Sequence, residues 1–345
     1  MPLEMLTPIV GDRSRRIHYF NGRVLTAEDL QVEQDAVRRR DQLLGRAVGE
    51  GVVEGLVVRR AADSLTAVTI SAGLALNRDG TPLVLEEDVT VAVLPDTEAT
   101  EPGDALFVPC PEAASAATSV PVGTGAYVLL AAPAAVGEGL APRVGLGDDG
   151  VARSCETRFM VEGIQFRLAH LDVDDDRLVP ATLAPLLRKL MALDDPPAGD
   201  RSRLRNLLGH WCLGTLEIGG FAGVHFDGAG LLPEGWSYGP LDRLRALEEG
   251  DPDRVAACEL PLALVLWRSD GIALVDRWAV RRRPAPPPAS HPWAPQVGVR
   301  RLAEAEAAFL HFQEHLEELA EEGVDPRGAA AAKLFAILPP GGFVP

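Results

Sequence analysis

The feature that most constrains the fold is a series of short apolar runs with a period of two, which begins after Gly45. The sequence here contains GVVEGLVVRR, LTAVTISAGLALNRDGTPLVL and DVTVAVLP, and these runs predict β-strands across residues 52–95. The tetrapeptide NRDG at 77–80 predicts a tight hairpin, because Asp-Gly accepts the positive φ that such turns need. We therefore expect a β module early in the chain.

More strand-like runs follow between residues 101 and 171, and a later pair of runs flanks Ser269, Asp270 and Gly271. The second strand of this later hairpin is expected to place four side chains on one face: Ile272, Leu274, Trp278 and Val280. The 28 prolines and 34 glycines favour many turns. These patterns predict an α+β protein made mainly of antiparallel β modules, arranged as a sandwich or small barrel.

Helical patterns interrupt the strands and suggest how the chain is divided. The sequence contains TLAPLLRKLMAL, RSRLRNLLGHWCLGTL and PLDRLRAL, which predict a helical insertion at about 179–250. His210 lies in one of these apolar helical stretches, which is typical of a packed core histidine. The expected parts are an N-terminal arm, helix and β module (1–98), a β domain that contains the insertion (99–283), a proline-rich linker (284–298), and a C-terminal amphipathic helix and tail (299–345).

A helix is predicted directly after Thr26, which is a suitable N-cap residue, and Asp29 adds negative charge to its first turn. Leu30, Val37 and Leu44 recur every seven residues along it, but Gln34 and Asp41 occupy the positions between them. The apolar stripe is therefore thin. We expect this helix either to dock narrowly on its own sheet or to contact copies of itself.

A second long helix is predicted from the sequence VRRLAEAEAAFLHFQEHLEELAEEG near the C-terminus. Its apolar residues alternate at spacings of three and four: Leu302, Ala305, Phe309, Phe312, Leu316 and Leu319. Such a heptad seam exposes more apolar surface than an isolated helix leaves in water. The seam is expected to bind either the body of the protein or another subunit.

The stretch HFQEH in this helix matches the H-x-x-E-H pattern of inverted zinc peptidases, with His311 and His315 as metal ligands and Glu314 as the base. Both histidines lie off the predicted seam, beside acidic residues expected to face water. Such peptidases need a third ligand well downstream, and only 30 residues remain. A solvated helix flank is therefore the favoured interpretation, and a zinc hydrolase is the alternative.

Two other short motifs are weaker. The sequence DVDDD resembles the start of a calcium loop through Asp172, Asp174 and Asp176, but Arg177 stands where that loop needs glycine. An acidic turn before a helix is favoured over a calcium site. The sequence GLGDDG at 145–150 matches a dinucleotide fingerprint, but it precedes a predicted strand and not a helix, which favours a simple loop.

Charge and composition disfavour several classes of partner. The formal net charge of −17 opposes binding to nucleic acid or to anionic membranes, and the arginine runs at 38–40 and 281–283 are interpreted as solvated faces or strand ends. The longest apolar run, at 126–136, is too short to cross a bilayer, and no signal core precedes it, so a cytoplasmic protein is expected. No cofactor is expected. Four widely spaced cysteines predict reduced, mostly buried thiols: Cys110, Cys155, Cys212 and Cys258.

The aromatic residues leave one binding alternative open. Five of them could stack on sugar rings if they shared an exposed sheet face: Trp236, Tyr238, Trp267, Trp278 and Trp293. Aromatic residues make up only 5% of the chain, which favours core positions for most of them.

Several phrases of the sequence together resemble a known group of proteins. They are HYFNGRVLTAEDLQVEQDAVRRRDQLL, GVVEGLVV, GLALNRDGTPLVL, CETRFMVEGIQFRL, ELPLALVLWRSDGIALVDRWAVRRR and RRLAEAEAAFLHFQEHL. In this order they resemble segments of accessory proteins of phage-tail-like contractile injection systems, from about residue 18 to 320. Members of that group often carry histidine and aromatic residues after the first helix, where this chain has GRAVGEG.

The resemblance implies a place in a particle and identifies no catalytic residue. The expected function is that of a non-enzymatic structural or adaptor subunit, at the baseplate, the cap or a fibre attachment, which binds other subunits and forms homo-oligomers. The expected contact residues are those of the two helix seams: Leu30, Val37, Leu44, Leu302, Phe309, Phe312, Leu316 and Leu319. A carbohydrate- or cell-surface-binding module of such a particle is the alternative.

Overall fold

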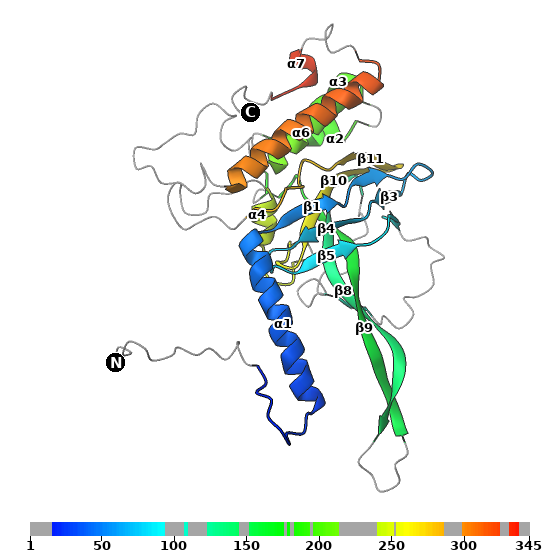
Figure 1. Cartoon of the computed structure of the whole chain (residues 1–345). Helices are drawn as coiled ribbons and strands as arrows, with labels where there is room; N and C mark the ends of the chain where they lie inside the picture. Colours follow the sequence, from blue (N-terminus) through cyan, green and yellow to red (C-terminus); the bar gives the residue numbers. More distant parts are fainter. Residues whose placement is uncertain are drawn as a thin grey trace, which may run out of the picture.

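The protein has an α+β fold whose strand pairings are all antiparallel in the part of the chain that the structure describes, as predicted. This computed structural model describes residues 16–93, 107–109, 123–144, 152–175, 178–179, 183–193, 196–213, 240–251, 253–285, 299–324 and 331–337. Figure 1 shows most helices gathered at one end of the molecule, while one helix and one long hairpin run away from the body at the other end.

The first β module contains two small three-stranded sheets. One has the order β1 (Gly51–Gly55), β4 (Gly73–Leu76), β5 (Pro82–Leu85), and the other has the order β2 (Val58–Arg60), β3 (Ala67–Ile70), β6 (Val89–Ala92). The hairpin predicted at NRDG joins β4 to β5, and Gly80 N–H donates to Asn77 O over 3.0 Å. Gly80 has a φ of 81°, which a residue with a Cβ adopts only at a cost.

The central sheet has five strands: β7 (Phe107–Pro109), β8 (Gly125–Val144), β9 (Ala152–Leu171), β10 (Leu260–Arg268) and β11 (Gly271–Asp276). Their order is β11-β10-β8-β7, and β9 also pairs with β8. The β8–β9 pairing runs from Ala126 opposite Leu171 to Val144 opposite Ala152. Because β10 pairs only with the first part of β8, the rest of this hairpin extends beyond the body (Figure 1).

The central sheet is buried on both faces, because successive side chains of a strand point to opposite sides. In β8, Ala126, Val128 and Leu130 contact the core that contains the helices, whereas Tyr127 and Leu129 contact the core shared with the first β module. This explains why β8 and β10 are continuous apolar runs and not alternating ones. The sheet therefore forms the middle layer between the first β module and the helices.

The predicted helical insertion between β9 and β10 is present as α2 (Ala184–Met191), α3 (Ala198–Cys212) and α4 (Pro240–Arg245). Leu187 of α2, Leu208 of α3 and Leu244 of α4 are fully buried in the core on that face of the sheet. The C-terminal helices are α6 (Val299–Glu321) and the short α7 (Ala331–Leu334), and both contact α3.

The N-terminal helix α1 (Ala27–Val48) begins as the sequence predicted. Thr26 Oγ1 accepts the backbone N–H of Asp29 over 3.1 Å, and Asp29 Oδ2 accepts the backbone N–H of Thr26 over 3.1 Å. The backbone N–H of Thr26 lowers the pKa of the Asp29 carboxyl, since it stabilises the charged form. This capping box fixes the first turn.

Two local predictions need correction. Strand β11 ends at Asp276, and residues 277–280 form a turn, so Trp278 and Val280 do not continue its face. Arg281 is buried and donates to the carbonyls of Gly55 and Leu56, so this residue of the run at 281–283 is not solvated, whereas Arg283 is exposed.

The cysteine prediction is partly wrong. Cys258 is disulfide-bonded, whereas Cys155 is a free, exposed thiol and Cys212 a free, buried one. Burial raises the pKa of the Cys212 thiol, so this group stays protonated. Cys110, the motif at 145–150 and most of the proline-rich linker lie outside the described residues.

Candidate assembly surface

Helix α1 stands away from the body (Figure 1), and its predicted seam is exposed. The side chains of Leu30, Val37 and Leu44 are 52%, 45% and 63% exposed. Gly45 is the one buried residue of this helix, all of which the structure describes. The seam therefore does not dock on the protein's own sheet, and α1 contacts its own β module only near its C-terminal end. We refer to these three residues as the α1 seam.

Helix α1 is held to the first β module near its C-terminal end. A Cβ atom on Gly45 would lie 2.1 Å from Gly80 O, so the two backbones touch where both residues are glycine. Arg46 Nε donates to Asp79 O over 3.0 Å, and Gln42 Nε2 donates to Thr81 Oγ1 over 3.3 Å. The helix is thus joined to the β4–β5 hairpin at one end and extends from there.

Residues 16–25, which we call the arm, fold back on the free end of α1. Arg23 Nη2 donates to Asp29 Oδ1 over 2.6 Å, and Ile17 N–H donates to Glu33 Oε2 over 3.4 Å. The arm nevertheless exposes large apolar side chains: Tyr19 (54%), Phe20 (61%), Val24 (84%) and Leu25 (44%). The free end of α1 therefore carries an apolar patch beside the α1 seam.

The far part of the β8–β9 hairpin has a similar character. Its exposed apolar residues are Leu140 (73%), Phe159 (54%), Met160 (51%) and Val161 (42%). An exposed ion pair, Arg38 Nη2 to Glu162 Oε1 at 3.2 Å, connects this hairpin with α1. Clustered exposed apolar side chains on projecting elements are typical of protein-binding surfaces. Together, the arm, the α1 seam and the hairpin form the candidate assembly surface.

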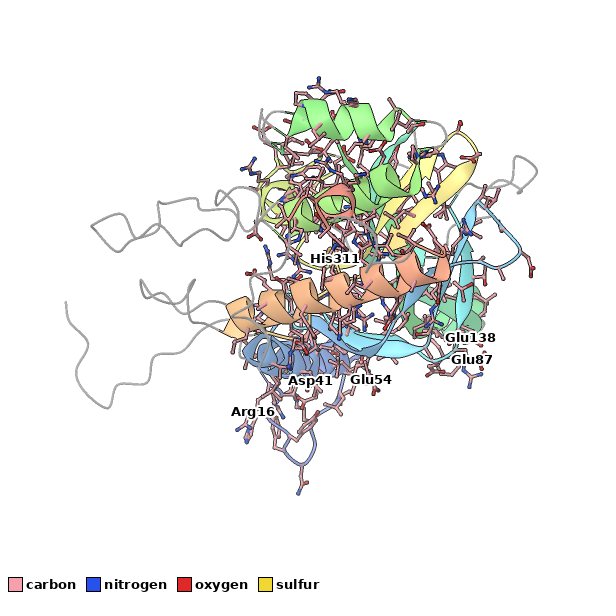
Figure 2. The ribbon with its side chains drawn as sticks, turned by 90° about the horizontal axis from the view of Figure 1, so that it is seen from above. Arg16, Asp41, Glu54, Glu87, Glu138 and His311 are labelled. Carbon is pink, nitrogen blue, oxygen red and sulfur yellow. The ribbon has the colours of Figure 1, made fainter. Side chains whose placement is uncertain are left out.

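The predicted seam of α6 is not the face that this helix buries. Leu302 is 68% exposed, and Phe309, Phe312 and Leu316 are half-buried, so Leu319 is the only predicted seam residue that is fully buried. The buried residues of α6 are Ala303, Glu304, Ala307, Ala308, His311, His315 and Leu319. The prediction that HFQEH lies on a solvated flank is therefore wrong. Figure 2 shows His311 on the side of α6 that faces the helices of the insertion.

Small residues let α6 approach α3 closely. A Cβ atom on Gly209 of α3 would lie 2.4 Å from the imidazole of His311, so this position has room only for hydrogen. The His210 and His311 rings meet edge to face, with centroids 6.1 Å apart. Alanines on the buried face of α6 have the same effect, because they bring the two helix backbones together.

Asp276, at the end of β11, provides the negative charge of the cluster beneath α6. Its Oδ2 lies 2.9 Å from His311 Nδ1 and accepts from Arg205 Nε over 3.1 Å, and its Oδ1 accepts from the backbone N–H of Ala279 over 3.0 Å. Arg205 Nη1 also contacts Glu318. We call Ser202, Arg205, His210, Asp276, His311 and His315 the polar cluster; each is at least 96% buried.

Ser202 connects α6 to the C-terminal segment. Its hydroxyl donates to Leu334 O over 2.7 Å, so it accepts the Nε2–H of His315 over 2.9 Å. This assigns His315 the tautomer with its proton on Nε2. Asn206 connects α3 to the C-terminal segment. Its Nδ2 donates to Ile337 O, and its Oδ1 accepts from the N–H groups of Ala336 and Ile337.

Burial determines the charges inside the polar cluster. Desolvation lowers the pKa of His210 and of His315 to about 3, so both are neutral at ordinary pH. For Asp276, burial raises the pKa of the carboxyl, but the charges of His311 and Arg205 outweigh it and the net shift is downward. The cluster therefore holds the Asp276 carboxylate, the Arg205 guanidinium and the neutral imidazoles of His210 and His315 in a buried site.

The geometry of the polar cluster does not fit a zinc site at HFQEH. The His311 and His315 rings have centroids 6.1 Å apart, and each ring turns to its own partner. Glu314 accepts from Arg277 Nε over 3.0 Å. Within the described ranges, no three His, Cys, Asp or Glu side chains come together to hold a metal ion.

Ser202 and His315 are not a catalytic pair either, because the histidine donates to the hydroxyl and so cannot accept its proton.

The remaining sequence candidates also have structural roles. Asp172 Oδ1 accepts the backbone N–H of Asp174 over 2.8 Å, and Asp174 Oδ1 lies 2.6 Å from Arg188 Nε. These carboxylates stabilise an acidic turn, as favoured from the sequence. Asp176 lies outside the described residues.

The aromatic residues that the structure describes do not form a sugar-binding face. Trp267 is 5% exposed in the core, and Trp278 is half-buried with the guanidinium groups of Arg277 and Arg281 about 5.5 Å from its ring. Trp236, Tyr238 and Trp293 lie outside the described residues. The prediction that most aromatic residues are core residues holds for Trp267.

Sequence reasoning placed His210 in the core correctly, since it is 2% exposed, but it missed Ser202, Arg205 and Asp276. The signal that could have found Ser202 and Arg205 is the mixed character of α3, in which ten of the fifteen residues are buried and several of these are polar. A helix of this kind needs hydrogen-bonding partners inside the protein. No such signal marks Asp276 at the end of β11.

Comparison with known proteins adds little to this geometry. No protein-family model matches the chain, and no curated protein matches it. A crystal structure of TssK aligns with 13% sequence identity and a TM-score of 0.27. The alignment covers 46% of this chain and 34% of the TssK chain, so it spans about a third of that protein. Similarity at this level carries no argument about activity or partners. No helix in the described part of the chain is long and apolar enough to cross a membrane.

Proposed function

We propose that the protein is a non-enzymatic structural or adaptor subunit of a phage-tail-like contractile injection particle. It binds other subunits through the candidate assembly surface, at the baseplate, the cap or a fibre attachment. The observation that carries the proposal is the exposure of large apolar side chains on two elements that project from a well-packed body, α1 with its arm and the β8–β9 hairpin (Figure 1). Such surface is stable in water when a partner covers it.

The sequence resemblance supports the proposal at the same elements. The phrase HYFNGRVLTAEDLQVEQDAVRRRDQLL covers the arm and most of α1, and CETRFMVEGIQFRL covers β9. The charge of −17 agrees with protein partners better than with nucleic acid. The polar cluster fits a structural role, because its groups connect α3, β11, α6 and the C-terminal segment to one another.

The test is quantitative mass spectrometry of tail-like particles sedimented from the native host. We expect the chain in a fixed ratio to the sheath and tube proteins. A Val37→Asp/Leu44→Asp variant should fold but disappear from the particles, because two charges interrupt the α1 seam. Leu65→Asp is the matched control, since Leu65 is 55% exposed on the body and should tolerate the charge. Absence of the unmodified chain from intact particles would refute the proposal.

A further inference from the structure

The α1 seam is symmetric about its middle residue. Val37 lies at the centre of the 22-residue helix, and Leu30 and Leu44 lie seven residues to either side. Seven residues are nearly two turns, so all three side chains share one exposed face. A surface with this symmetry is complementary to a reversed copy of itself, because leucine then meets leucine and the central valines meet each other.

The charges of α1 change sign at the same point. Residues 27–37 carry four carboxylates and no basic residue, whereas residues 38–48 carry four arginines and one carboxylate. Asp29, Glu33, Arg38 and Arg46 already have partners within the chain, at Arg23, the backbone N–H of Ile17, Glu162 and Asp79. The acidic half of one helix thus complements the basic half of a reversed copy, whereas a copy running the same way would place like charges together.

We propose that α1 pairs antiparallel with α1 of a second copy of this chain, with a two-fold axis beside Val37. The inference rests on the proposed role of α1 as an assembly surface and names its occupant. In this arrangement Leu30 packs against the second copy's Leu44, and the reverse contact follows from the symmetry. The α1 helices, about 33 Å long, overlap over their whole length.

The residues beside the seam agree with this register. At 100° per residue, Glu33 and Arg40 lie on one flank of the seam, and Gln34 and Asp41 lie on the other. In an antiparallel pair, each flank meets the same flank of the partner at reversed height. Glu33 then faces the second copy's Arg40, and Asp41 faces the second copy's Gln34. Each contact occurs twice.

The arm also gains a partner in this arrangement. Helix α1 is joined to its own body near Gly45, so antiparallel pairing brings the body of the second copy to the free end of α1. The exposed side chains of Tyr19, Phe20, Val24 and Leu25 lie at that end. One two-fold contact therefore covers both the α1 seam and the apolar patch of the arm.

The first test is a charge exchange, measured by sedimentation equilibrium of the full chain. We expect the unmodified protein to be dimeric. Glu33→Arg and Arg40→Glu should each raise the dissociation constant about tenfold, because each variant turns two attractions into two repulsions. The double variant Glu33→Arg/Arg40→Glu should restore the original value. If the dissociation constant of the double variant stays high, the register is wrong, because both single variants would then act through other contacts.

The second test is disulfide cross-linking in a Cys155→Ser background, which removes the exposed native thiol. Val37→Cys should cross-link to itself, because only residues near the two-fold axis meet their own copies. Leu30→Cys and Leu44→Cys should not cross-link alone but should do so when mixed. Self-cross-linking of Leu30→Cys would show a parallel pair and overturn the proposal.

A third outcome separates this inference from the proposed function. If the chain stays monomeric at all concentrations, yet native particles contain it and lose it with Val37→Asp/Leu44→Asp, then α1 binds a different subunit. That result would reject the second copy as the occupant and leave the particle role standing. If the chain is monomeric and native particles do not contain it, both proposals are rejected.

Discussion

Helices α1 and α6 are almost equal in length, with 22 and 23 residues, and both carry apolar residues at heptad spacing, but they meet their surroundings in opposite ways. The α1 seam faces water, whereas α6 buries two histidines and leaves Leu302 exposed. The difference teaches that apolar periodicity does not by itself select the buried face. The buried face of α6 is the one that fits the hydrogen-bonding groups and small residues of α3.

The largest expected effect comes from removing the charge that α3 and α6 share. Asp276→Ala leaves Arg205 and His311 buried without their carboxylate, which should lower the free energy of unfolding by about 3–5 kcal/mol. Urea denaturation at pH 7 measures this loss. Asp270→Ala is the control, because Asp270 is exposed in the β10–β11 turn and should change stability by less than about 0.5 kcal/mol. Equal effects of the two variants would contradict the burial of the polar cluster.

The second-largest effect on the free energy of unfolding is expected from acid, which should weaken the α3–α6 contact. His210 and His315 have a folded-state pKa of about 3 and an ordinary value of 6.5, so below pH 6.5 the unfolded chain binds protons that the folded protein does not. Their contribution is constant above this range and falls as the pH drops from 6.5 towards 3, with roughly 2 kcal/mol lost for each histidine at pH 5.

Urea denaturation between pH 7 and pH 5 checks this dependence. The variant His210→Gln/His315→Gln provides the comparison, since neither side chain can titrate. Its stability should fall less with decreasing pH than that of the unmodified protein. The same slope in both proteins would mean that other groups cause the acid dependence.

Two glycines of α3 sharpen the comparison further. Gly209→Ala should destabilise the protein by about 1–3 kcal/mol, because the new methyl group would overlap the His311 imidazole. Gly199→Ala in the same helix has its nearest neighbour, Lys333 O, at 3.4 Å, and should be neutral or stabilising by up to about 1 kcal/mol. Thermal unfolding measures both. A neutral Gly209→Ala would show that α6 does not approach α3 this closely.

The smallest expected effect on folding belongs to α1. Leu44→Asp should change the free energy of unfolding of the monomeric chain by less than about 0.5 kcal/mol, because Leu44 is 63% exposed. Leu319→Asp in α6 should be strongly destabilising, since Leu319 is 2% exposed. Chemical denaturation at a concentration where α1 is unpaired makes this test. A large loss with Leu44→Asp would show that the α1 seam packs within its own chain.

Local signals account for the parts of the fold that the sequence predicted. The Thr26 capping box and the hairpin at Asn77–Gly80 depend on residues within four positions of each other, and both are present. The strands followed from alternation and apolar runs, which need no knowledge of distant partners. The exposure of Leu30, Val37 and Leu44 agrees with one of the two predicted arrangements of α1, and their role as contact residues stays a prediction.

The polar cluster could not be predicted in this way, because its contacts join residues far apart in the chain. Ser202 and His315 are 113 positions apart, and Arg205 and Asp276 are 71 apart. A histidine flanked by glutamates looks solvent-facing until a helix with matching hydrogen-bonding groups is placed against it. The wrong face of α6 was therefore predicted from a correct periodicity.

The β8–β9 hairpin has one further consequence, which concerns mechanical load. Strand β8 runs without interruption from the projecting hairpin into the core, where it pairs with β10 from Ala131 to Gly125. A pull on the far end of the hairpin is therefore transmitted along the backbone and shears this ladder, so that many hydrogen bonds share the force at once. The projecting hairpin is therefore attached to the body through a row of strand-pairing contacts and not at a single point.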